Sequence, residues 1–134
     1  KALVDKPDDY DVFQYVLSAM TTLALRGRVI LVGRGAAIAP QGLPGGVHVR
    51  IYSGEAFKIH RMKQRMPELA DRPDDLRAAI EKEGRRRESF VERHMAASPR
   101  DPKFYHLMIN NDRFSLGEMA EMVRRLVRSV GKEG

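Results

Sequence analysis

Residues 28–35 read Arg28-Val29-Ile30-Leu31-Val32-Gly33-Arg34-Gly35. Apolar, mostly β-branched residues in an unbroken run are typical of a strand buried on both faces of a parallel sheet. The run stops abruptly at Gly33, which predicts a strand over residues 28–32 with Arg34 at its carboxyl end. Ligands bind beyond this end of parallel strands, and a guanidinium between glycines can hold a phosphate with two parallel hydrogen bonds. The alternative is a glycine turn that carries a solvated arginine.

Helices and strands alternate on both sides of this run. Before this run, apolar residues recur at helical spacing and predict a helix that follows Asp8 and Asp9 and stops at Gly27. The apolar residues of this helix are Phe13, Val16, Leu17, Met20, Leu23 and Ala24. After it, a surface loop rich in proline and glycine covers residues 40–46. The elements expected next are a strand over 47–52, a helix with Ala56, Ile59, Met62 and Met66 on its apolar face, a helix opened by Pro73, a strand over 104–109, and a helix capped by Ser115 and Glu118. This order predicts an α/β fold with a parallel sheet.

Composition limits the class of protein. The 134 residues suffice for a single domain or a part of one, so residues 1–134 are interpreted as one domain. The chain starts without methionine and without the layout of a signal peptide, so we expect a longer protein upstream. The sequence has no cysteine and no apolar run long enough for a bilayer, which predicts a cytoplasmic protein without a membrane span. The net charge of +6 favours an anionic partner.

A second group of arginines lies in residues 85–93 and consists of Arg85, Arg86, Arg87 and Arg93. The apolar periodicity of the third helix lapses from residue 81 to residue 87, so this part is expected to be solvated or mobile without a ligand. Guanidinia this close repel one another, and a polyphosphate would offset the repulsion. The alternative is a solvated basic helix face. Arg61 and Arg65 are interpreted as surface residues, with a phosphate contact as the alternative.

Other chemistries find no support in the sequence. The histidines, His48, His60, His94 and His106, lack the spacing of metal ligands, so no metal site is expected on them. No serine is framed as Gly-x-Ser-x-Gly, which argues against nucleophilic hydrolysis. No Tyr or Phe interleaves with the arginines at 85–87, so nucleic-acid binding is not expected.

Taken in order, residues 28–35, residues 47–51, the arginines of 85–93 and residues 104–110 resemble the cytidylate kinase-like family over roughly residues 10–130. The resemblance implies a P-loop nucleoside monophosphate kinase fold, a three-layer parallel sheet with flanking helices, that transfers a phosphoryl group from ATP with Mg²⁺ to a (d)CMP-like nucleotide. It implies that Gly33, Arg34 and Gly35 hold the acceptor phosphate together with Arg86. It also implies that residues 85–93 form a lid in which Arg87 and Arg93 are catalytic.

Three departures from the family pattern bear on function. Gly35 stands where cytidylate kinases carry Asp, which leaves the base preference open, and Gly84 stands where an acidic residue is usual. No Gly-x-x-x-x-Gly-Lys-Ser/Thr loop occurs, so the central strand that carries it is expected to be absent and the sheet incomplete. An upstream segment, a second chain or a swapped copy in a homodimer would supply the missing central strand. We expect this chain to be inert alone and the intact protein to be a phosphotransferase; the alternative is a non-catalytic nucleotide- or phosphate-binding or regulatory module.

Overall fold

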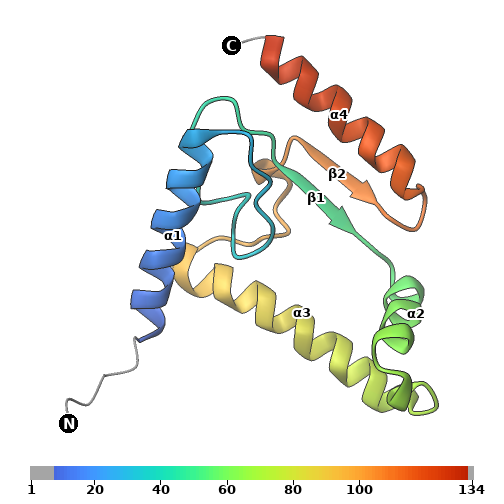
Figure 1. Cartoon of the computed structure of the whole chain (residues 1–134). Helices are drawn as coiled ribbons and strands as arrows, with labels where there is room; N and C mark the ends of the chain where they lie inside the picture. The colour runs from blue at the N-terminus through green and yellow to red at the C-terminus, as the bar shows by residue number, and fades with distance from the viewer. Residues whose placement is uncertain (1–7, 133–134) are drawn as a thin grey trace.

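The computed structural model describes residues 8–132 (Figure 1). Its elements are α1 (Asp9–Arg26), β1 (Val49–Tyr52), α2 (Glu55–Arg65), the 3-10 turn η1 (Pro67–Leu69), α3 (Pro73–Met95), the 3-10 turn η2 (Pro102–Phe104), β2 (Leu107–Asn110) and α4 (Leu116–Lys132). The two strands pair in parallel, with Val49 opposite Leu107 and Tyr52 opposite Asn110. The predicted α/β fold with parallel pairing is confirmed at this level, and the three-layer arrangement stays a prediction.

Capping contacts confirm the predicted ends of α1 and the predicted start of α4. Asp8 caps α1 by accepting a hydrogen bond from the Asp11 amide at 2.7 Å, and Gly27 ends the helix at a φ of 71°. The Ser115 hydroxyl accepts from the Glu118 amide at 3.2 Å, while the Glu118 carboxylate accepts from the Ser115 amide at 2.7 Å. This reciprocal pair is the capping box expected ahead of α4.

The prediction of a strand over residues 28–32 is wrong. This segment has no strand pairing, and the side chains of Ile30 and Val32 are 89% and 88% exposed. An apolar, β-branched sequence favours a strand only where a neighbour accepts and donates its backbone hydrogen bonds. In the part of the chain that the structure describes, the sheet consists of β1 and β2, so residues 28–32 have no such neighbour.

The other two strands are shorter than predicted. Pairing begins at Val49 rather than at residue 47, and at Leu107 rather than at residue 104, because η2 takes up Pro102–Phe104. The ends of the two strands are tied by the Asp112 carboxylate, which accepts a hydrogen bond from the Gly54 amide at 2.8 Å.

Helix α3 runs without interruption through the arginine-rich stretch. It includes Gly84 and extends to Met95, so residues 85–93 are the second half of a long helix. Residues 84–87 are all exposed, as the lapse of apolar periodicity predicts. We call residues 85–93 the lid-like segment.

The main core lies where α1 meets the second half of α3. Phe13 of α1 packs on Phe90 and Val91 of α3, with the two rings edge to face at 6.3 Å between centroids. Leu17, Ile38 and Met95 pack around this cluster. The core therefore fixes α3 against α1 and brings the loop that follows residue 33 onto the same helix. No helix among residues 8–132 is long and apolar enough to cross a bilayer.

Candidate phosphate-binding site

The glycine turn, residues 33–35, has an uncommon backbone conformation. Gly33, Arg34 and Gly35 have φ values of 74°, 53° and 76°. A left-handed conformation is unfavourable for a residue with a Cβ, so Arg34 is held there by its surroundings. The Ala36 amide closes the turn by donating to the Gly33 carbonyl at 2.9 Å. The amides of Arg34 and Gly35 donate to no acceptor within residues 8–132, and successive N–H groups of this kind can bind an anion.

The glycine turn packs directly on α3. A Cβ at Gly35 would overlap the thioether end of Met95 and lie 3.6 Å from a methyl group of Val91. The Arg34 guanidinium lies over the ring of Phe90, 5.3 Å from its centroid. Residues three or four positions apart are neighbours on a helix surface, so this contact brings Arg34 beside the lid-like segment.

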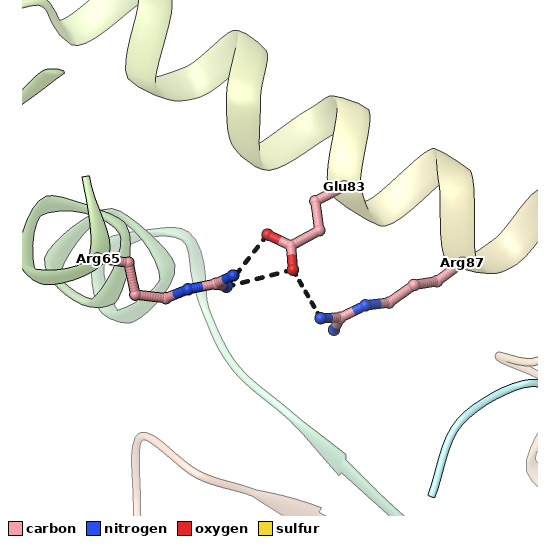
Figure 2. Close-up of polar contacts among 3 residues, drawn as sticks. All are labelled: Arg65, Glu83 and Arg87. Carbon is pink, nitrogen blue, oxygen red and sulfur yellow. Dashed lines mark hydrogen bonds and ion pairs between the residues drawn. The ribbon is translucent and has the colours of Figure 1, made fainter.

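Arg87 belongs to a three-residue ion cluster that joins two helices. It donates to a carboxylate oxygen of Glu83 at 2.7 Å, and Arg65 at the end of α2 reaches both oxygens of the same carboxylate at 3.2 and 3.3 Å (Figure 2). The sequence analysis did not identify Arg65 and Glu83 as a pair. A signal exists in the i,i+4 spacing of Glu83 and Arg87, and the short turn between two prolines brings the end of α2 to α3.

Arg93 is engaged in a contact between α1 and α3. It forms an ion pair with Asp9, whose carboxylate also lies 3.4 Å from Nε2 of His94. The His94 ring stacks on Phe13 at 4.8 Å. The contact that Arg93 makes is thus structural, and its predicted catalytic role stays a prediction.

The consecutive arginines point to different surroundings. Arg85 pairs with Glu81, and Arg87 pairs with Glu83. The Arg86 side chain is exposed and makes no ion pair with any of residues 8–132. Of the three, Arg87 is the one that shares a partner with another helix, which bears on the open question of which arginine meets a ligand.

A second basic surface lies between the start of α2 and α3. It is a groove of about 510 Å³ whose lining includes Lys58, Arg77, Arg85 and Arg100. Three acidic partners compensate its arginines: Glu55 pairs with Arg77, Glu81 with Arg85, and Glu88 with Arg100. The groove contains none of the residues proposed from sequence to bind the acceptor phosphate or to catalyse transfer.

His48 lies just before β1, outside the glycine turn and the lid-like segment. Burial lowers the pKa of His48, and the neighbouring His106 lowers it further. The two rings stack at 5.4 Å, and Nδ1 of His106 accepts a hydrogen bond from the His48 amide at 3.0 Å. These residues precede β1 and β2, at the end of the strands opposite to Gly54 and Asp112. They have a structural role in joining two loops.

Comparison with known proteins identifies the family. The model of the cytidylate kinase-like family matches residues 2–113, which include the glycine turn, both strands and the lid-like segment. No curated protein matches the chain. The match covers most of the sequence, and its range includes the motifs at residues 28–35, 47–51, 85–93 and 104–110. The chain belongs to the cytidylate kinase-like family.

Proposed function

We propose that the chain binds the phosphate group of a nucleoside monophosphate, of the cytidine monophosphate class, at the glycine turn. The observation that carries the proposal is the packing of this turn on α3, which places the Arg34 guanidinium over Phe90, within the lid-like segment. Membership of the cytidylate kinase-like family supports a nucleotide kinase-like function. Binding would therefore use a guanidinium and backbone amides from one loop together with arginines from one helix.

Each part of the glycine turn has a chemical task in this proposal. The planar guanidinium of Arg34 donates two parallel hydrogen bonds to phosphate oxygens. The amides of Arg34 and Gly35 add donors that cost no side-chain entropy on binding. Gly33 and Gly35 permit the left-handed backbone that exposes these amides.

The lid-like segment supplies the remaining charge. Arg86 has an exposed guanidinium for the acceptor phosphate, and Arg87 and Arg93 neutralise negative charge that develops on phosphate oxygens. ATP supplies the phosphoryl group when it is bound. In this proposal Arg93 exchanges its exposed ion pair with Asp9 for the ligand, which releases one contact between α1 and α3.

ATP and Mg²⁺ use is general in the family. The sequence has no Gly-x-x-x-x-Gly-Lys-Ser/Thr loop, which cradles ATP phosphates in P-loop enzymes. Within residues 8–132, no group of three or more His, Asp or Glu side chains is arranged to hold a metal ion. The described side chains therefore do not form a Mg²⁺ site by themselves, and we assign no chemical step to Mg²⁺. We propose that this chain binds the acceptor nucleotide without transferring a phosphoryl group.

We also propose that one further strand completes the sheet beside β1 and carries the missing phosphate loop. Ile51 and Tyr52 of β1 are 54% and 42% exposed, and the apolar side chains of Val29, Ile30 and Val32 are exposed as well. The glycine turn ends the latter segment, so a strand placed there would bring its loop near Arg34. In this proposal the strand comes from a segment outside these 134 residues. The association test given below distinguishes this source from a second copy of the chain.

Titration calorimetry with CMP, dCMP, AMP, GMP and UMP tests the binding proposal. Arg34→Gln removes a charge-assisted pair of hydrogen bonds and should weaken nucleotide binding by at least about tenfold. The matched control is Arg128→Gln, which removes the same charge from an exposed position on α4. Equal affinities of the wild type and Arg34→Gln would overturn the proposal.

Phosphoryl transfer is assayed with the same monophosphates in the presence of ATP and Mg²⁺. The expected result is no turnover by these 134 residues. Appreciable turnover would refute the argument from the missing loop. A non-catalytic binding or regulatory role predicts the same nucleotide affinity. The two roles are distinguished by assaying the chain together with the proposed loop-bearing segment, because a non-catalytic module should stay inactive in that assay as well.

A further inference from the structure

Arg65, Glu83 and Arg87 form an ion cluster that joins α2 to α3. Two guanidinia from different helices converge on one carboxylate (Figure 2). Oε1 of Glu83 accepts from both, at 3.2 Å from Arg65 and 2.7 Å from Arg87. Helix α2 packs on α3, and η1 makes the short reversal that joins them, so the two arginines are held on opposite sides of this oxygen.

The charges of the cluster do not balance. Two positive groups share one negative group, which leaves an excess charge of one. A phosphate dianion has twice the charge of the carboxylate and more oxygens, so it can accept from both guanidinia and neutralise them. The side chains of Arg65 and Arg87 are 60% and 75% exposed, so a ligand can reach both from solvent.

Glu83 is also held weakly enough to leave. Both guanidinia are exposed, so water screens their attraction for the half-buried carboxylate and keeps the energy of each pair small. The Glu83 side chain is half-buried at 31% exposure, and a change of rotamer turns its carboxylate into solvent. Exchange of the carboxylate for a phosphate therefore requires no movement of either helix.

We propose that Arg65 and Arg87 form a second phosphate-binding position and that Glu83 occupies it as a competing carboxylate until a phosphate group displaces it. The inference rests on the proposed nucleotide function and adds Arg65 as a ligand-binding residue and Glu83 as a positioning residue. Glu83 holds the two guanidinia at a common point, and it also lowers affinity because it must be expelled. The ligand class is a phosphate dianion, such as a phosphate group of a bound nucleotide.

The test measures inorganic pyrophosphate binding by titration calorimetry and follows the arginine Nε–H NMR signals. Glu83→Gln removes the competing charge and should raise affinity about two- to fivefold, the range of an exposed ion pair. Arg65→Gln should lower affinity by a similar factor. The matched control is Glu81→Gln, which breaks the i,i+4 pair with Arg85 and changes the net charge equally. Circular dichroism spectra verify that each variant is folded.

The outcomes separate this inference from the proposed function. If Glu83→Gln and Glu81→Gln have equal affinity for pyrophosphate, or if Arg65→Gln matches the wild type, the second phosphate position does not exist. CMP titration of Arg34→Gln is independent of that result, because Arg34 lies on Phe90 and makes no contact with Glu83. A loss of CMP affinity there, without an effect of Glu83, would overturn only the inference drawn from the cluster.

Discussion

Replacing Gly35 with alanine tests whether packing on α3 holds the glycine turn in place. The residue has a φ of 76°, and an added Cβ would overlap the end of the Met95 side chain. Gly33 has a similar φ of 74° with open space around it, so Gly33→Ala carries the backbone strain alone. That strain is about 1–2 kcal/mol, and the loss of unfolded-state entropy offsets about 0.4–1 kcal/mol of it.

The predicted free-energy changes follow from this comparison. Gly33→Ala should destabilise the fold by about 1 kcal/mol. Gly35→Ala should destabilise it by about 2 kcal/mol, because Met95 must also move away from the core of Phe13 and Phe90, and its flexible side chain keeps this extra penalty near 1 kcal/mol. Urea unfolding followed by far-ultraviolet circular dichroism measures both values.

A double-mutant cycle assigns the difference to the contact itself. In a Met95→Ala background the overlap is absent, so Gly35→Ala should lose only about 1 kcal/mol, as Gly33→Ala does. Equal losses for Gly33→Ala and Gly35→Ala in the wild-type background would refute the reasoning. The proposed phosphate site would then lack the packing that places Arg34 beside the lid-like segment.

Three further predictions address other parts of the fold. Burial and His106 lower the pKa of His48 in the folded state. The contribution of His48 to the free energy of unfolding is therefore fully present above the unfolded pKa of about 6.5 and decreases as the pH falls below that value. A urea midpoint that stays constant between about pH 7 and pH 5.5 would contradict this. Ser115→Ala removes the N-terminal cap of α4 and should lower the unfolding free energy by about 1 kcal/mol, measured by urea titration. The double variant Ile30→Glu and Val32→Glu should abolish any self-association seen by analytical ultracentrifugation without loss of helix content, and association that persists would place the contact elsewhere.

Local signals predicted the helices well because their ends are determined by nearby residues. Asp8 and Gly27 bound α1, and Ser115 with Glu118 starts α4, all through contacts within four positions of the chain. The same reasoning placed Pro73 at the first turn of α3. Signals of this kind do not depend on tertiary context, so they survive in the fold.

Strand prediction failed at residues 28–32 because strands depend on partners that a local pattern does not reveal. Ile30 and Val32 have the composition of a buried strand, yet both are almost fully exposed. Residues 49–52 have a weaker apolar pattern and form a strand, because β2 pairs with them. The pair of Arg65 and Glu83 escaped prediction for the same reason, since the contact joins residues 18 positions apart.

The arginines of the proposed site differ in what a ligand must displace to reach them. Arg34 rests on the Phe90 ring, so a phosphate meets its guanidinium without expelling a carboxylate. Arg87 must exchange Glu83, a half-buried carboxylate that it shares with Arg65. Arg93 must give up Asp9, which also holds α1 against α3 beside the buried His94. Phosphate binding should therefore begin at Arg34 and involve Arg93 last. In the proposed site, binding at Arg93 therefore releases one exposed ion pair between α1 and α3.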